Sequence, residues 1–500
     1  MRAHTRRSLD EMKPGKKLAP STETNADISE SHVAVMDPKG SAARRFLAPL
    51  ALAQFICSFA GSNMNVMIND ISRDLNTDVK GVQLAITLFL LIMAILMIPC
   101  SKLTDRWGRK FCFILGLVLY GIGALMSAFS PNLGVLILGN SVFEGVGTAF
   151  LIPPVYILTT LTFSEMSGRA RAFGIISGLG GIGAAAGPLI GGLITTAISW
   201  RAAFIFQTVV VFTIVVLSRR VVDPLPADPK RPFDIVGAIL SAVGLFFVVS
   251  GILLADTNPL LMALCFVVGV LFLVCFFLFI RHRERVGKEP LLSISLFENR
   301  ISNLGLITQN AQWLILMGVS FVVSVYLQTV RGHNAIQTGV IFTAATLGIL
   351  FSSLAAGGLA MKYSQRALIV AGFLVTLVGV GFLLWLVPPT SSAWAFVPGL
   401  LFIGLGLGVM LTPSVNVVQS AFPENQQGEI SGLSRSISNL GSSFGTAICG
   451  TILVAGLSSG AYAVAMIVLA VVAVIGLIVA RLLPSQLGLP QVPVAESTSG

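Results

Sequence analysis

The stretch of sequence that decides the fold is residues 82–110, in which VQLAITLFLLIMAILMIPC is followed directly by SKLTDRWGRK. The first part carries no charge and is long enough, as a helix of about 20 residues, to cross the ~30 Å hydrocarbon core of a membrane. The second part is basic, as short cytoplasmic loops of membrane proteins are. Composition extends this pattern to the whole chain, because 55% of the 500 residues are hydrophobic and 11% are charged, whereas soluble domains carry about 25% charged residues. We therefore predict an all-α, polytopic membrane protein.

Apolar runs of this kind recur along the chain and predict about fourteen transmembrane helices. They lie near residues 46–68, 82–100, 112–129, 133–154, 172–197, 202–218, 235–254, 260–280, 303–327, 336–360, 367–387, 394–419, 430–456 and 461–482. We accordingly expect a disordered cytoplasmic tail (1–43), an N-terminal six-helix bundle (44–221), basic connectors with two extra helices (222–300), a C-terminal six-helix bundle (301–483) and a cytoplasmic tail (484–500).

Lysines and arginines in the short loops predict the orientation of these helices. One set of loops holds most of them, including Lys102, Arg219 and Arg281, whereas the opposite loops hold few. We therefore expect that side and both termini to be cytoplasmic, and the protein to span the lipid bilayer of the cell membrane. Because the net charge of +10 is spread over these loops, we expect no nucleic-acid partner.

Several function classes lack the residues that they need. The six cysteines are scattered, without a CxxC pair or a nearby histidine, so we expect no metal and no cofactor. No GxxxxGK[ST] phosphate loop occurs, so any pumping must draw on an ion gradient or on a partner. The four histidines lie in the tail or in loops, and we expect no enzyme. For the oligomeric state we expect a monomer.

The loop after the second predicted span resembles the signature G-x-L-A-D-R-x-G-R-K of the major facilitator superfamily, with Ser101 in place of the leading glycine. Gly108 permits a tight turn, and Asp105 can offer its charge to a helix terminus or a basic group, so the loop could hold one conformation as a latch. A plain positive-inside loop is the alternative. A weaker copy, GGLAMK at 357–362, has Met361 in place of the acid. The matching residues are Asp105, Arg106, Gly108, Arg109 and Lys110.

The fifth predicted span matches G-x8-G-x3-G-P-x2-G-G, the pattern that marks antiporters within that superfamily. Small residues at this spacing let another helix approach closely, and the proline removes a backbone donor and bends the span. Ordinary packing of small residues between helices is the alternative. In the family the pattern accompanies export. The residues are Gly174, Gly183, Gly187, Pro188, Gly191 and Gly192.

The number of spans, the antiporter pattern and Trp200-Arg201 at the start of the sixth span together resemble the fourteen-spanner drug:proton antiporter group. Members of that group usually carry an acid in the first span and an arginine in the fourth, where this chain has Ala60 and Asn140. These differences put proton coupling through the usual residues in doubt.

Glu144 lies near the middle of the fourth predicted span. A charge at the bilayer centre costs about 2.5–3.5 kcal/mol on insertion scales, so Glu144 should face the bundle interior or a wet cavity and favour its protonated form. Glu144 is therefore a candidate proton carrier in place of the missing acid. The alternative is a permanently protonated side chain that bonds to a neighbouring helix.

Other polar residues at span depth are candidates for lining a central cavity, although polar side chains also bond helix to helix. We expect Arg435 to be an interfacial arginine, with a contact to Asp105 as the alternative. Asp70, Asp74, Glu424 and Glu429 are interpreted as solvated ends of spans. The cavity candidates are Asn63, Asn65, Gln309, Gln312, Trp313 and Asn416.

These features predict a secondary transporter in which two six-helix bundles rock about a midplane site. The favoured function is proton-driven export of hydrophobic or amphipathic small molecules, among which cations could use Glu144. The first alternative is a dedicated exporter or importer of one metabolite. A membrane sensor that transports nothing is a weaker alternative, because no loop is long enough to hold a signalling domain.

Overall fold

The computed structural model describes residues 41–163, 166–224, 226–255, 257–360, 362–388, 390, 392–423 and 426–484. The predicted tails lie outside these ranges, except for residues 41–43, which begin the first helix, and residue 484.

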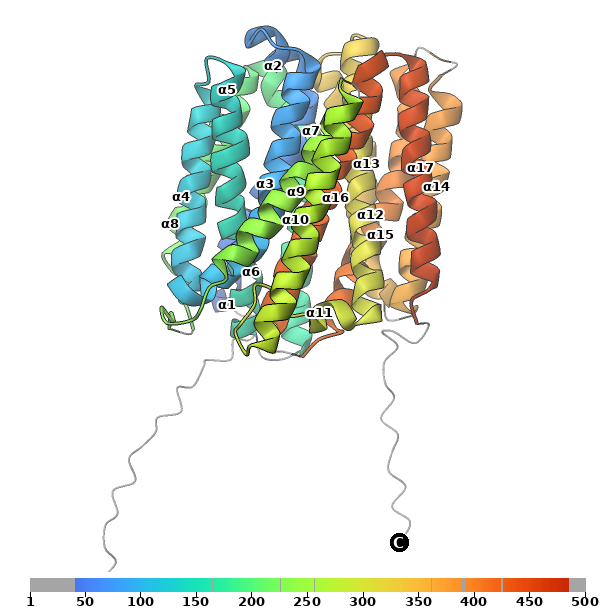
Figure 1. Cartoon of the computed structure of the whole chain (residues 1–500). Helices are drawn as coiled ribbons and strands as arrows, with labels where there is room; N and C mark the ends of the chain where they lie inside the picture. Colours follow the sequence, from blue (N-terminus) through green and yellow to red (C-terminus); the bar gives the residue numbers. More distant parts are fainter. Residues whose placement is uncertain are drawn as a thin grey trace, which may run out of the picture. The chain divides into compact units, whose positions relative to one another are not determined.

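The N-terminal block consists of helices and their short extensions (Figure 1). They are α1 (Ser41–Asn63), the 3-10 turn η1 (Met64–Val66), α2 (Ile68–Asp74), α3 (Val79–Trp107), α4 (Arg109–Ala128), α5 (Leu133–Leu136), the π-helix η2 (Ile137–Glu144), α6 (Gly145–Thr162), α7 (Met166–Ala197) and α8 (Trp200–Ser218). α5, η2 and α6 follow one another without a break and form a single span, Leu133–Thr162.

The remaining helices comprise the inserted pair and the C-terminal block. The inserted pair is α9 (Ile235–Leu253) and α10 (Pro259–Arg285). The C-terminal block contains α11 (Ser295–Glu298), α12 (Arg300–Val325), the π-helix η3 (Tyr326–Val330), α13 (Ala335–Ala360), α14 (Gln365–Leu386), the 3-10 turn η4 (Ala393–Ala395), α15 (Phe396–Gln419), α16 (Gln427–Gly456) and α17 (Ser459–Arg481).

Fourteen of the described helices are long and apolar enough to cross a membrane, which confirms the predicted number of spans. Polar side chains cap several of them where the sequence leaves an apolar run; Asp78, for example, accepts a hydrogen bond from the Gly81 amide at the start of α3, at 2.8 Å. Asn258 caps α10, and Pro259 occupies its first turn, where no donor is lost. Sequence patterns therefore define the ends of the spans as well as their number.

The contacts between the two blocks are made chiefly by two helix pairs. α3 packs against α16, and α7 packs against α13. The inserted helix α9 packs on both α3 and α16, while α10 packs on α9. On α10, the side chains of Leu264, Val267 and Leu271 are 56%, 66% and 58% exposed, and exposed aliphatic side chains on a membrane helix face lipid. The inserted pair thus covers the α3–α16 contact from the lipid side.

The helix bundle has a terminal end and a distal end. The terminal end carries the first residue of α1 and the last residue of α17, together with α11. The distal end carries α2 and α5 (Figure 1).

Candidate functional site: a charged clasp and a cavity between the helix blocks

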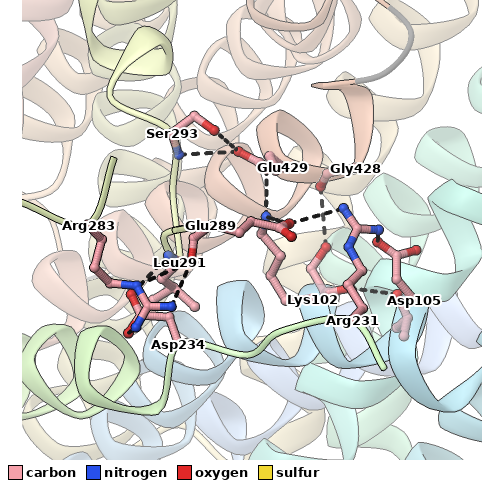
Figure 2. A network of polar contacts seen from close by, with 12 residues as sticks. Lys102, Asp105, Arg231, Asp234, Arg283, Glu289, Leu291, Ser293, Gly428 and Glu429 are labelled. Atoms are coloured by element: carbon pink, nitrogen blue, oxygen red, sulfur yellow. Dashed lines mark hydrogen bonds and ion pairs between the residues drawn. The ribbon is translucent and has the colours of Figure 1, made fainter. Parts of the chain in front are cut away.

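A chain of ion pairs joins the two blocks at the terminal end (Figure 2). Lys102 Nζ lies 2.6 Å from Glu429 Oε1 and 3.1 Å from Glu289 Oε1. Arg231 then joins Glu289, at 3.1 Å, to Asp105, at 2.7 Å. We call these five residues the clasp. It links α3 of the N-terminal block to α16 of the C-terminal block through both connectors of the inserted pair.

The loop that carries Asp105 is held by its own turn. Gly108 has φ +94°, a conformation that disfavours any side chain, and it ends α3 and begins α4. The backbone amides of Arg109 and Lys110 then donate to Asp223 Oδ2, at 2.7 and 3.3 Å, as an acid at a helix N-terminus does. Arg109 also pairs with Asp105 at 2.7 Å. The turn therefore fixes the direction in which Asp105 faces the clasp.

The connectors of the inserted pair are fastened to each other beside the clasp. Asp234 accepts from the Gly237 amide at the start of α9 and from the Leu291 amide after α10, at 3.0 and 3.1 Å. Arg283, near the end of α10, lies 3.5 Å from Asp234 Oδ1 and donates to the Glu289 carbonyl at 2.9 Å. Figure 2 shows Arg283 and Asp234 side by side with Glu289 beyond them. The hydrogen bond from Arg283 to the Glu289 carbonyl thus holds the backbone of Glu289 in position.

The electrostatics of the clasp favour its charged form. Partial burial alone would raise the pKa of Glu289, but Lys102 and Arg231 outweigh it and lower the pKa below its ordinary value. Burial likewise opposes the charge of Arg231, but Asp105 and Glu289 prevail and raise its pKa. Both residues are therefore ionised in the clasp.

Two of the acids interpreted as solvated ends of spans have partners instead. Glu429 binds Lys102 and accepts from the Ser293 hydroxyl at 2.9 Å, so its interpretation as a solvated end is wrong. Asp74 forms an ion pair with Arg201 and accepts from the Trp200 indole at 2.9 Å. These partners lie more than a hundred positions away in the chain, beyond the reach of a local pattern. Glu424 lies outside the described residues. Arg106, a residue of the predicted latch loop, borders a shallow surface hollow.

A cavity of about 370 Å³ lies between α6 and α7 on one side and α13 and α15 on the other. We call it the main cavity. Gly174, near the start of α7, and Ala360, at the end of α13, both line it, so it extends toward the terminal end. Its walls are mostly apolar, with Tyr156 and Asn416 among the polar side chains. A second cavity of about 40 Å³, the minor cavity, lies among α1, α3, α6, α12 and α16.

The glycine-rich pattern of α7 lies in close helix contacts on the distal side of the main cavity. A Cβ added to Gly183 would collide with the Phe55 carbonyl of α1, and one added to Gly187 with Ser62. A Cβ at Gly191 would lie 3.1 Å from Asn63 Cβ, and one at Gly192 would collide with the Ala335 carbonyl at the start of α13. Reciprocally, a Cβ at Gly339 of α13 would lie 2.5 Å from the Pro188 carbonyl. Gly174, by contrast, has open space beside it.

The distal end is closed between the blocks by neutral hydrogen bonds. Asn65 donates to the Ser320 hydroxyl at 2.9 Å, and Gln328 donates to the Asn65 carbonyl at 2.8 Å. The Thr329 hydroxyl donates to the Asn69 side chain at 3.0 Å. We call this group of residues the distal seam.

The predicted cavity residues have different environments. Asn416 lines the main cavity and Trp313 the minor cavity. Gln309 accepts from Ser434, and Gln312 donates to the Leu407 carbonyl, so both join helices. Asn65 belongs to the distal seam. Asn63 is fully buried, and its side chain has no hydrogen-bond partner among the described residues.

Glu144 ends the π-helix η2 and is fully buried, with 0% of its surface exposed. One carboxyl oxygen lies 3.4 Å from the Ser127 hydroxyl of α4, while the other has no hydrogen-bond partner in the described part of the chain. The residue lies between α4 and the span that carries it, inside the N-terminal block, and lines neither the main nor the minor cavity. π-helical turns occur frequently at functional sites.

Tyr156 and Gln54 are polar residues of the cavities that the sequence did not single out. Tyr156 lines the main cavity, and Gln54 lines the minor one. The Tyr156 hydroxyl donates to Gln54 Oε1 at 3.2 Å. Both lie in apolar runs and give no signal on their own. Arg435, which we expected at the interface, instead contacts Tyr156 and lines the minor cavity, whereas Asp105 pairs with Arg109 and Arg231.

Three of the proteins that this chain resembles are named for resistance, efflux or transport. The puromycin resistance protein pur8 of Streptomyces alboniger is 29% identical over 438 residues, which cover 85% of each chain. The multidrug efflux pump LfrA of Mycolicibacterium smegmatis is 27% identical over 82% of this chain and 80% of its own. The riboflavin transporter RibZ of Clostridioides difficile is 25% identical over 80% of this chain and 85% of its own.

The family model of the Major Facilitator Superfamily matches residues 50–446. This range begins in α1 and ends within α16, so it includes every residue of the clasp and of both cavities, while α17 lies beyond it. Together with fourteen helices able to span a membrane, the match makes this a multi-pass membrane protein, and the chain belongs to the Major Facilitator Superfamily.

Proposed function

We propose that this chain is a secondary active transporter that exports hydrophobic or amphipathic small molecules in exchange for protons. The observation that carries the proposal is the main cavity, about 370 Å³ in volume, which lies between the two blocks and has close helix contacts on its distal side. A cavity of this size, apolar with a few polar groups, suits a drug-sized ligand. Alternating access requires such a cavity at the interface of two blocks that move as units.

The direction of transport is inferred from two further observations. Relatives such as pur8 and LfrA are named for resistance and efflux. The glycine pattern of α7, which accompanies export in the family, forms the close contacts with α1 and α13. We accordingly assign the terminal end, with its basic loops, and both chain termini to the cytoplasm of a cell membrane. The protein acts as a monomer in this proposal, because a single chain contains the whole cavity.

Protons are carried by Glu144 in this proposal. The residue is the carboxyl group in the π-helical turn, and one of its oxygens has no hydrogen-bond partner among the described residues. An ionisable group buried in a membrane span indicates a functional site unless a partner neutralises it. Because Glu144 lines neither cavity, it would act on the substrate site through η2 and α4 and not by direct contact.

The test is dye transport by purified protein in lipid vesicles, with and without an imposed pH gradient. We expect wild-type protein to accumulate a lipophilic dye only when the gradient is present. We expect Glu144→Gln, which keeps the shape but cannot ionise, to lower the gradient-driven rate by at least about a hundredfold, the lower end of the range for loss of a proton-transfer group.

Glu298→Gln is the matched control, because it makes the same chemical change at an exposed position outside the spans. It should transport like wild type. If Glu144→Gln retains full gradient-driven transport, Glu144 is not the proton carrier. If wild-type protein moves no dye under either condition, export of hydrophobic compounds is the wrong function.

A dedicated metabolite carrier is the second candidate function, and the similarity to the riboflavin transporter RibZ favours it. Such a carrier would select one compound and reject others of similar hydrophobicity. Competition for dye transport by a panel of unrelated lipophilic compounds separates the two functions: broad competition supports the exporter, and competition by one chemical class alone supports the metabolite carrier.

A further inference from the structure

Arg435 is a basic residue deep in a membrane span. It lies eight positions after Gln427, the first residue of α16, and is therefore about 12 Å from the start of the helix, measured along the helix axis. Neighbouring serines on the same helix bond to other helices: Ser434 donates to Gln309 at 2.8 Å, and Ser436 donates to the Ala94 carbonyl of α3. This part of α16 is thus packed against neighbouring helices in the protein interior.

The guanidinium of Arg435 is directed toward Tyr156. Its Cζ lies 4.4 Å from the centroid of the tyrosine ring, and one of its nitrogens donates to the tyrosine hydroxyl. The hydroxyl in turn donates to Gln54, whose amide donates to the Ser58 hydroxyl, each at 3.2 Å. Arg435 thus begins a polar chain that runs along the boundary of the two cavities, since Tyr156 lines the main cavity and Gln54 and Ser58 line the minor one.

The charge of Arg435 is not balanced within the cavities. Among the residues that the structure describes, no carboxylate lines either the main or the minor cavity. Among the described residues Arg435 has no ion-pair partner, in contrast to Lys102 and Arg231 of the clasp. A neutral tyrosine stabilises a guanidinium through its ring and hydroxyl, but it does not cancel the charge. A cavity with one uncompensated cation in its wall attracts an anion and repels a cation.

We propose that Arg435 and Tyr156 form the polar end of the substrate site, and that the exported molecule carries an acidic group on a hydrophobic body. This inference rests on the proposed export function and specifies its substrate class. The apolar walls of the main cavity hold the body of the molecule, while its carboxylate, sulfonate or phosphate group meets the guanidinium. A planar guanidinium binds such groups with two parallel hydrogen bonds.

Tyr156 has two roles in this arrangement. Without substrate, its hydroxyl and ring partly satisfy Arg435. With substrate, the side chain turns aside, so that the acidic group replaces the hydroxyl as acceptor from Arg435. Asn416, on the opposite wall of the main cavity, is the neutral polar group available to the other end of the molecule.

The experiment uses two dyes with the same xanthene ring and opposite charge: fluorescein, an anion, and rhodamine 6G, a cation. Binding to the full-length purified protein is measured by fluorescence anisotropy without a pH gradient, so the result does not depend on transport. We expect fluorescein to bind wild-type protein at least about tenfold more tightly than rhodamine 6G, because about tenfold is the gain in affinity that one charge-assisted hydrogen bond gives.

Variants then test the assignment to Arg435. We expect Arg435→Gln to weaken fluorescein binding by about tenfold or more and to leave rhodamine 6G binding unchanged or stronger. Arg435→Lys should retain part of the preference, because it keeps the charge but loses the planar pair of donors. Tyr156→Phe should change fluorescein affinity less than Arg435→Gln, since it keeps the ring and removes only the hydroxyl.

The outcomes separate this inference from the proposed function. If wild-type protein binds fluorescein no better than rhodamine 6G, or if Arg435→Gln weakens both dyes equally, the acidic-substrate site is wrong. If Arg435→Gln does not fold, Arg435→Lys decides: equal affinities of this variant and wild type for fluorescein would overturn the bidentate contact. If fluorescein binds through Arg435 but no pH gradient drives its transport, the site stands and proton-driven export fails.

Discussion

The two ends of the molecule join the same pair of helix blocks by different chemistry. At the terminal end the clasp uses ion pairs, such as Lys102 with Glu429 at 2.6 Å. At the distal end the seam uses neutral hydrogen bonds, such as Asn65 with Ser320 at 2.9 Å, supported by glycine contacts. Charged pairs near water are weakened by salt and by loss of one charge, whereas close-packed backbone contacts are weakened chiefly by added volume. The two ends should therefore respond to different perturbations.

A single distance, measured between two spin labels at the terminal end, reports opening of either end of the molecule. Spin labels on Arg220→Cys and Tyr363→Cys, two exposed positions at the terminal end in different blocks, report the separation of the blocks there. Cys275 is the exposed native cysteine among the described residues and is replaced by serine in this reporter. In a rocking transporter the terminal distance shortens when the distal end opens and lengthens when the clasp opens.

The largest effect is expected from added volume at the distal end. In Gly192→Ala the new Cβ collides with the Ala335 carbonyl of α13. Overpacking typically costs about 1–3 kcal/mol, so the distal-closed state should lose population about 5- to 150-fold and the terminal distance should shorten. Gly381→Ala is the control, because a Cβ there meets nothing within 4 Å. An unchanged distance distribution in Gly192→Ala would mean that the α7–α13 contact does not hold the distal end closed.

A smaller effect is expected from removal of one charge in the clasp. Lys102→Gln leaves Glu289 with Arg231 and Glu429 with Ser293, so the clasp is weakened and not abolished. With the Lys102 side chain 10% exposed, we expect a loss of about 1 kcal/mol and a roughly fivefold larger population of long terminal distances. Lys288→Gln changes an exposed lysine next to Glu289 in the connector after α10, and it should leave the distances unchanged. Equal effects of the two variants would show that the clasp is only surface charge.

The smallest effect is expected from mild acid. Because the pKa of Glu289 is lowered in the clasp, its contribution is fully present above its ordinary pKa and is lost only as the pH falls through the lowered value. Terminal distances should therefore stay constant from about pH 8 to about pH 5 and lengthen only in stronger acid. The measurement is made in Glu144→Gln, so that protonation of Glu144 does not contribute. A lengthening between about pH 7 and pH 5 would contradict the assignment of Glu289 to the clasp.

The fold could be predicted from the sequence because each span is a local property. Apolar length defines a membrane helix without knowledge of its neighbours, and all fourteen were found in this way. The latch loop was also recognisable, since its residues are consecutive. Its partners were not: Arg231 lies 126 positions from Asp105, and Glu429 lies 327 positions from Lys102. Nothing near Glu429 in the sequence distinguishes a clasp residue from a solvated loop acid.

The candidate site was less predictable than the fold for a related reason. Polar residues in spans either line cavities or join helices, and the sequence gives the same signal for both. Gln309 and Gln312 join helices, while Asn416 lines the main cavity. Arg435 resembled an interfacial arginine because only its distance from the helix end is visible in the sequence. Its direction depends on Tyr156, which a different helix supplies.

The inserted helix pair gives the clasp a kinetic property. Glu289 lies four residues beyond the end of α10 at Arg285, and Arg231 lies four residues before the start of α9 at Ile235. Short tethers of this kind keep their ends at an effective concentration in the millimolar range. An opened clasp therefore finds its partners without a diffusional search, and soluble peptides at micromolar concentration cannot compete with it. Because the clasp residues are tethered so closely to their helices, each transport cycle would end with fast reclosure of the clasp at the terminal end.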